Sequence, residues 1–172
     1  VHADHITGVA TLKKFFFNAQ SVISTHGGTL CSDMVVTEGD SIDFGKYSIR
    51  VLSTPGHTNG CISFSVDGKL FTGDSLFIRG CGRTDFQQGD AALMYDSIMT
   101  KLFTFPDETE VYPGHNYVGI EKSTIGEEKK YNPRLAGKTK EEFIEIMENL
   151  NLPYPKKIQE SVPANLHCGD VT

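Results

Sequence analysis

Histidines and aspartates in this chain gather in short polar segments beside glycine or proline. These segments are His2-Ala3-Asp4-His5, Thr54-Pro55-Gly56-His57-Thr58, Thr72-Gly73-Asp74 and Tyr112-Pro113-Gly114-His115. The histidines and aspartates follow, or nearly follow, apolar or β-branched runs, as expected for loops at strand ends, where scaffolds place reactive groups. Imidazole together with carboxylate suits zinc, iron or manganese, whereas calcium prefers oxygen ligands alone. A single histidine is more often structural, but the repetition of this pattern predicts a metal site.

Short strand patterns separated by turns must position these segments. The predicted strands are Ser21–Ser24, Ile42–Phe44, Tyr47–Ser53, Ile62–Val66, Lys69–Thr72 and Glu110–Tyr112. Asp67-Gly68, between two of them, is a strong signal for a type I′ hairpin turn. Pro113 ends the last strand because proline cannot donate a ladder hydrogen bond.

Three amphipathic patterns predict helices between the strands. The first covers Thr7–Phe17, the second runs from a cap at Asp90 to about Leu102, and the third runs from Thr139 to about Leu150. Thr139 and Glu142 form a capping box. The residues expected to face the core are Val9, Leu12 and Phe16, then Leu93, Ser97, Ile98 and Leu102, then Phe143, Met147 and Leu150. Mixed strands and helices predict an α/β or α+β fold.

Length and composition limit the classes of protein. The length of 172 residues predicts a single domain over 1–172. The net charge is −6, and the sequence has no basic stripe of the kind that nucleic-acid binding needs. No apolar run approaches the roughly 18 residues of a membrane span. Cys31, Cys61, Cys81 and Cys168 lie far apart without a CxxC pair. Such spacing predicts no disulfide framework, a reducing intracellular compartment and small buried thiols.

The chain begins at Val1, without methionine, and enters a polar cluster at once. Natural domains rarely begin inside a functional loop. We therefore expect an N-terminal portion that this sequence does not contain.

The four polar segments resemble, in order, the metal-binding motifs of the metallo-β-lactamase superfamily. Those motifs are His-x-His-x-Asp-His, a Gly-His loop, a Thr-Gly-Asp strand end and a final Gly-His. Val1–His5 matches the first motif except for its leading histidine, which would precede Val1. The resemblance implies an αββα sandwich of the metallo-β-lactamase type, with its N-terminal strands missing from this sequence and a metal cleft at one edge of the sheets.

Two branches of this superfamily compete. Gly80-Cys81-Gly82-Arg83 is shared with the glyoxalase II hydrolases, but Cys61 and the remainder of Arg79–Gly89 depart from that branch. These departures resemble the persulfide dioxygenases. So do three C-terminal segments, Ser123–Arg134, Asn149–Lys157 and Val162–Gly169. Glyoxalase II enzymes normally carry a larger helical C-terminal domain, whereas 57 residues follow His115 in this sequence. The resemblance therefore favours the dioxygenases, with the hydrolases as the alternative.

The dioxygenase resemblance implies one ferrous iron per chain, held by His57, Asp74 and a third histidine expected just before Val1. Two histidines and a carboxylate are the facial triad of non-haem iron oxygenases. A hydrolase would hold a dinuclear site of zinc or iron instead. A third hypothesis is that the chain is a metal-poor, inactive remnant that acts only as a binding module. The groups expected around the iron, or on a second metal in a hydrolase, are His2, Asp4, His5 and His115.

The implied reaction oxidises glutathione persulfide with dioxygen to sulfite and glutathione, in sulfide detoxification. Arg83 and Tyr117 are candidate partners for the carboxylates of glutathione, although an ion pair from Arg83 to Asp85 is an equal expectation. Cys168 is a candidate contact to the substrate sulfur. The favoured interpretation, for Cys168 as for Cys31, is a buried packing residue. Cys81 is left open between these two roles.

Family members often form homodimers, and no nucleic-acid or membrane partner is expected. The implied compartment is intracellular, which means the mitochondrial matrix in a eukaryote and the cytoplasm in a bacterium.

Overall fold

A computed structural model describes residues 1–29 and 31–170 of the chain. These residues form two compact units. Of the described residues, the first unit contains 1–29, 31–36 and 151–170, and the second contains 37–150. The expectation of a single domain stays a prediction.

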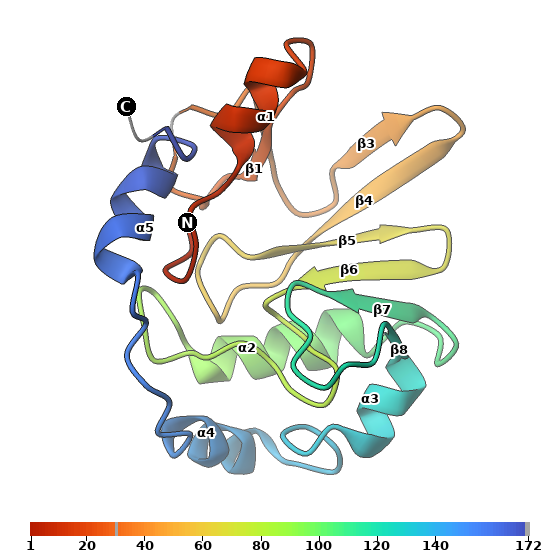
Figure 1. Cartoon of the computed structure of the whole chain (residues 1–172). Coiled ribbons are helices and arrows are strands. Elements are labelled where there is room, and N and C mark those ends of the chain that lie inside the picture. The colour runs from red at the N-terminus through yellow and green to blue at the C-terminus, as the bar shows by residue number, and fades with distance from the viewer. Residues whose placement is uncertain (30, 171–172) are drawn as a thin grey trace. The chain divides into compact units, whose positions relative to one another are not determined.

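The second unit is built on a six-stranded sheet with the order β3-β4-β5-β6-β7-β8 (Figure 1). Its strands are β3 Ser41–Phe44, β4 Tyr47–Ser53, β5 Ile62–Val66, β6 Lys69–Gly73, β7 Glu110–Pro113 and β8 Ser123–Thr124. Only β6 and β7 pair in parallel, and the other neighbours are antiparallel. The five strands predicted within this unit are confirmed to within one or two residues, and β8 was not predicted.

The turn between β5 and β6 follows from its two residues. Asp67 and Gly68 both adopt positive φ angles, 48° and 71°. Positive φ at both central positions defines a type I′ turn, whose twist matches that of the flanking strands. The predicted hairpin is therefore confirmed.

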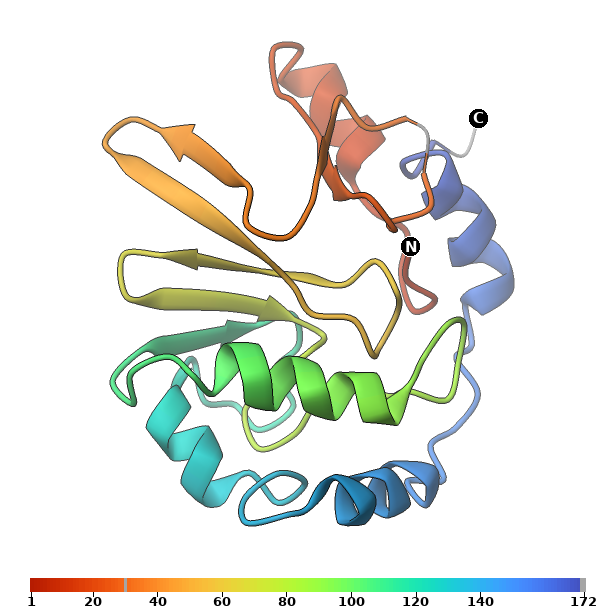
Figure 2. The ribbon, with the colours of Figure 1, turned by 180° about the vertical axis from the view of Figure 1, so that it is seen from behind.

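Helices pack on one face of this sheet. They are α2 Ala91–Ser97, continued by a π-helical turn η1 Ile98–Leu102, then α3 Ile125–Tyr131 and α4 Lys140–Glu148. Figure 2 shows α2 in front of the sheet, running in nearly the same direction as its strands. Their buried side chains form the apolar core together with residues of the strands. That core contains Leu52, Leu70 and Val111 from β4, β6 and β7, and Met94, Ile98, Leu102, Phe143 and Met147 from the helices.

The predicted caps of α2 and α4 are confirmed. Asp90 accepts a hydrogen bond from the Leu93 backbone N–H, and Thr139 and Glu142 form both bonds of the capping box. Phe143 and Met147 are buried as predicted. Leu93, however, is 42% exposed and the prediction that it faces inward is wrong, because Met94 occupies that position in the core.

The first unit contains α1 Val9–Phe15, β1 Val22–Ser24, β2 Met34–Val36 and α5 Ile158–Leu166. Its two strands pair in parallel, with Val22 opposite Met34. The predicted helix and first strand are confirmed, but the predicted apolar stripe is wrong. Helix α1 buries no residue, and Leu12 and Phe16 are 55% and 62% exposed. The spacing of these apolar residues therefore indicates a helix, but it does not indicate that one face of the helix is buried.

Candidate metal centre

Three polar side chains of the second unit come from the ends of three strands that run in the same direction. Because β4 and β6 are each antiparallel to β5, and β6 is parallel to β7, the carboxyl ends of β4, β6 and β7 share one edge of the sheet. His57 follows β4, Asp74 follows β6 and His115 follows β7. The edge of an open sheet where strands end is the usual place for a ligand site.

Asp74 lies between the two histidines. Its Oδ2 is 3.4 Å from His57 Nε2, and its Oδ1 is 3.5 Å from His115 Nε2. The side chains of Asp74 and His57 are 9% and 16% exposed, and that of His115 is 31% exposed. Each carboxylate oxygen therefore faces a different imidazole within a partly buried site.

The tautomer of His57 is fixed by its surroundings. His57 Nδ1 lies 2.7 Å from the backbone oxygen of Arg83, and a carbonyl oxygen can only accept a hydrogen bond. Nδ1 therefore carries the hydrogen and donates it to Arg83. The lone pair of neutral His57 is consequently on Nε2, the atom that faces Asp74. A metal-ligating histidine typically donates its other ring N–H in this manner.

Two glycines allow the backbone to approach this site closely. A Cβ atom at Gly82 would collide with the backbone oxygen of Asp74 and would lie 3.2 Å from His57 Cγ. A Cβ atom at Gly114 would lie 3.0 Å from Asp74 Oδ1. The Gly82 N–H also donates to the Asp74 carbonyl at 2.9 Å. Gly82 is therefore required by space at the site, and a side chain at position 114 would press against the Asp74 carboxylate.

Buried hydroxyl groups, which the sequence reading missed, support the loop before His57. Thr54 Oγ1 lies 2.9 Å from Ser63 Oγ, and Ser75 Oγ donates to Thr54 Oγ1 at 2.8 Å. Ser97 Oγ donates to the Pro55 carbonyl at 2.7 Å. Serine and threonine carry no sequence signal of burial, so only their positions in the fold reveal this role.

A second network that the sequence reading missed fixes the Arg79–Gly82 segment. The Glu128 carboxylate, fully buried in α3, accepts from the Arg79 side chain and backbone N–H. Asn132 Nδ2 donates to the Gly80 carbonyl at 3.0 Å. Arg134 Nη1 donates to the Cys81 carbonyl at 2.7 Å. The segment that ends at Gly82 and Arg83 is therefore positioned by charged and amide groups from the C-terminal half of the unit.

Arg83 makes the predicted ion pair with Asp85. Its Nε and Nη2 donate to Asp85 at 2.6 and 2.7 Å. This pairing lowers the pKa of Asp85 and raises the pKa of Arg83. The structural role of Arg83 is confirmed, whereas its contact with a substrate stays a prediction.

Tyr117, the other predicted substrate contact, lies beside His115. The two rings are stacked with centroids 5.7 Å apart, and Phe77 packs against both rings at 5.8 Å. Tyr117 is 77% exposed. The ring of Tyr117 is therefore accessible next to one of the candidate ligands.

His2, Asp4 and His5 lie in the first unit and form a cluster of their own. His5 Nδ1 lies 2.9 Å from Asp4 Oδ1, and the rings of His2 and His5 are stacked with centroids 6.3 Å apart. The structure thus brings together His57, Asp74 and His115 in one unit and these three residues in the other. A shared role at one metal stays a prediction.

The predictions that the cysteines stay unpaired and that Cys31 is buried are wrong. Cys31 and Cys168 form a disulfide within the first unit, and Cys31 is exposed. These residues are 137 positions apart in sequence, so their spacing gives no signal of the pairing. Cys168 therefore carries no thiol in this state, and its predicted contact with a substrate sulfur stays untested. Cys61 and Cys81 are free and buried, in line with the general prediction of small buried thiols, and burial raises the pKa of both. The substrate contact left open for Cys81 stays untested.

Comparisons with known proteins identify the family of this chain. Residues 1–115 match the model of the metallo-beta-lactamase superfamily. The chain belongs to this superfamily. It is also similar to the crystal structure of ETHE1 from Myxococcus xanthus, with a TM-score of 0.95 and 52% identity over 99% of this chain and 75% of that one. The expected fold of the metallo-β-lactamase type is therefore confirmed.

Two curated relatives represent the two competing branches. The chain is 49% identical over 170 residues to "Persulfide dioxygenase ETHE1, mitochondrial" of Mus musculus, which covers 98% of this chain and 66% of that protein. It is 37% identical over 134 residues to a hydroxyacylglutathione hydrolase of Photobacterium profundum, which covers 78% of this chain and 52% of that protein. The first likeness is stronger and includes the C-terminal part of the chain. The chain spans about two thirds of the length of the curated dioxygenases it matches.

Proposed function

We propose that this chain belongs to an iron-dependent persulfide dioxygenase that converts glutathione persulfide, dioxygen and water into glutathione and sulfite. The observation that carries the proposal is the likeness to the persulfide dioxygenase of Mus musculus, at 49% identity over 98% of the chain. The balanced reaction consumes one dioxygen and one water for each persulfide and leaves glutathione as the thiol product. The outer sulfur of the persulfide is oxidised and dioxygen is reduced.

The donor set fits a transition metal. His57 Nε2 and the Asp74 carboxylate offer nitrogen and oxygen ligands, and a third histidine is proposed to precede Val1. Two histidines and one carboxylate match the ligand type of non-haem iron oxygenases. Bound ferrous iron would supply the redox chemistry that dioxygen requires. His2, Asp4, His5 and His115 are proposed to surround this centre and to orient its ligands.

The residues of this chain contribute positioning and binding. The Arg83 carbonyl accepts the His57 Nδ1 hydrogen and keeps Nε2 directed to the site. The Arg83 guanidinium and the exposed Tyr117 hydroxyl are proposed to bind the carboxylates of glutathione. Arg83 is already oriented by Asp85 and by the Phe86 ring, 4.4 Å from its guanidinium carbon. A preoriented guanidinium loses less side-chain entropy when it binds.

One observation favours a second candidate, the thioester hydrolase. Asp74 presents one oxygen to His57 and the other to His115. A carboxylate placed in this manner is suited to bridge two metal ions, as a dinuclear hydrolase would require. Metal count and reaction therefore have to be measured together.

The test uses the full-length protein loaded with iron. Oxygen uptake with glutathione persulfide and about one iron per chain are the expected results. Two metals per chain with hydrolysis of lactoylglutathione and no oxygen uptake would contradict the proposal and support the hydrolase. Negligible metal content with neither activity would support the non-catalytic remnant.

The cellular compartment belongs to this proposal as well. The curated mouse relative is named as mitochondrial, and a mitochondrial matrix location is proposed if this chain is eukaryotic, or a cytoplasmic one if it is bacterial. Within the part of the chain that the structure describes, no helix is long and apolar enough to cross a membrane.

A further inference from the structure

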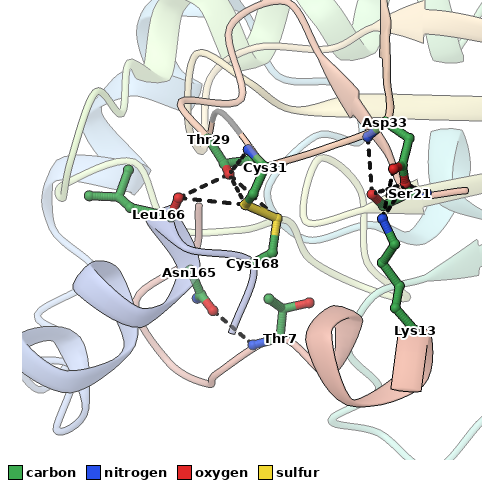
Figure 3. The surroundings of a disulfide bond; sticks show 9 residues. All are labelled: Thr7, Lys13, Ser21, Thr29, Cys31, Asp33, Asn165, Leu166 and Cys168. Atoms are coloured by element: carbon green, nitrogen blue, oxygen red, sulfur yellow. Dashed lines mark hydrogen bonds and ion pairs between the residues drawn. A yellow bond between two sulfur atoms is a disulfide. The ribbon is translucent and has the colours of Figure 1, made fainter. Parts of the chain in front are cut away.

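The Cys31–Cys168 disulfide joins two distant parts of the sequence within the first unit (Figure 3). Cys31 precedes β2, and Cys168 lies just after α5. The Cα atoms are 6.1 Å apart. This bond therefore ties the C-terminal helix to the N-terminal part of the same unit.

The two sulfur-bearing residues differ in exposure. Cys31 is exposed, whereas Cys168 is only 8% exposed. A thiolate from solvent consequently reaches Cys31 more easily, and access selects the sulfur that is attacked. Attack at Cys31 would release the sulfur of Cys168 as the leaving thiolate.

A hydroxyl group is in place to stabilise that thiolate. Thr29 Oγ1 lies 2.6 Å from Cys31 Sγ and 3.5 Å from Cys168 Sγ. It donates to the Leu166 carbonyl at 3.0 Å while the disulfide is closed. A thiolate is a charged acceptor, and hydrogen bonds to charged groups are stronger than those to neutral ones. The Thr29 hydroxyl can therefore turn from Leu166 to the released sulfur.

The backbone beside Cys168 supports the N-terminal polar segment. Asn165, on α5, donates from Nδ2 to the carbonyls of His2 and His5 at 2.9 and 2.8 Å. Its Oδ1 accepts from the Thr7 N–H at 2.8 Å, and the Cys168 carbonyl accepts from the Ala10 N–H at 3.0 Å. The segment that contains His2 and His5 is thus held by groups within three residues of the disulfide.

Cys168 also has a backbone conformation that cysteine rarely adopts. Its φ angle is +57°, in the left-handed region, where a side chain other than glycine is disfavoured. Such conformations persist only when the surrounding structure fixes them. Opening the disulfide removes one of those constraints, so the end of α5 gains freedom to rearrange.

We propose that Cys31–Cys168 is a site of thiol–disulfide exchange with small thiols of the glutathione class, and that its opening loosens the segment from His2 to Ala10. In the first step a thiolate RS⁻ bonds to Cys31, the Cys31–Cys168 bond breaks and Cys168 leaves as a thiolate. In the second step another RS⁻ attacks the mixed disulfide, which releases RSSR and leaves Cys31 as a thiolate. This exchange does not depend on the proposed oxygenase reaction.

The first experiment maps the exchange. The full-length protein is treated with reduced glutathione, quenched by acid, alkylated and mapped by mass spectrometry. We expect glutathione on Cys31, an alkylated Cys168, and no glutathione on the buried Cys61 and Cys81, which act as internal controls. A native protein whose disulfide resists glutathione, or that carries glutathione first on Cys168, would overturn the proposed site.

The second experiment measures hydrogen exchange of backbone amides in the oxidised protein, the reduced protein and the Cys31→Ser variant. We expect exchange at least tenfold faster over residues 2–10 in the last two, with little change in residues 54–58 and 72–74. Asn165→Ala, with its disulfide intact, should give a similar increase. Unchanged exchange on reduction together with faster exchange in Asn165→Ala would show that Asn165 acts without the disulfide, and would overturn the coupling.

Discussion

The two units of this chain position their polar segments by different physical means. In the second unit, His57, Asp74 and His115 follow strands of one sheet, above a core that includes Leu70 and Phe143. In the first unit, α1 buries no residue, and the segment from His2 to His5 is held by Asn165. A large apolar core positions side chains through packing, whereas a small unit depends on individual polar bonds and a disulfide. Substitutions should therefore have very different consequences in the two units.

The largest expected effect is on the core of the second unit. Phe143→Ala should lower the free energy of unfolding by about 3–5 kcal/mol, because it leaves a cavity at a fully buried position. Phe16→Ala, the matched change at the C-cap of α1, should cost less than about 0.5 kcal/mol, because Phe16 is 62% exposed. Urea unfolding followed by circular dichroism measures both. Similar losses for the two variants would contradict the contrast between the units.

The next effect is on metal affinity. Asp74→Asn keeps the shape of the side chain but removes the charge that faces both histidines. Changes to groups around a metal ligand already cost about 10–100-fold in affinity, so we expect a loss of at least about 100-fold for a ligand itself.

Competition with a chelator, with metal content read by mass spectrometry, measures this affinity. Asp67→Asn is the control, because Asp67 is an exposed turn residue and asparagine also suits its φ of 48°. An Asp74→Asn protein that retains its metal would exclude Asp74 as a ligand.

The strands and the metal-binding residue types could be predicted from the sequence because both have local signals. The type I′ turn at Asp67-Gly68 and the caps at Asp90 and Thr139 depend on neighbouring residues and were predictable. The order of the four polar segments also identified the superfamily before any geometry was known.

Features that depend on distant residues were not predictable. The pairing of Cys31 with Cys168 has no local signal, and the buried Glu128 network joins residues about 50 positions apart. The predicted burial of Leu12 and Phe16 is wrong, because a helical period does not show whether another element covers that face of the helix.

A third prediction tests close approach at the metal centre. Gly82→Ala should lower the free energy of unfolding by about 1–3 kcal/mol, because the added methyl group would collide with the Asp74 backbone. Gly8→Ala is the control, since a Cβ atom there would meet nothing within 4 Å. Thermal unfolding of both variants measures the difference. Equal stability of the two would show that the loop moves aside without cost.

The smallest expected effect concerns the ion pair of Arg83 and Asp85. The pKa of Asp85 is lowered by its hydrogen bonds from Arg83, so folding favours the ionised carboxylate. Its contribution is therefore present at pH 7 and disappears as the pH falls below the usual value of about 4 for aspartate. Because the Asp85 side chain is 51% exposed, Asp85→Asn should cost only about 0.2–1 kcal/mol at neutral pH.

Urea unfolding at pH 7 and near pH 3, each with and without added salt, measures this difference. The gap between wild type and Asp85→Asn should narrow in acid, and at pH 7 it should also narrow in salt because an exposed pair is screened. A gap that stays constant between the two pH values would mean that Asp85 stabilises the loop through the shape of its side chain. Arg83 would then owe its orientation to packing on Phe86 and not to the charge of Asp85.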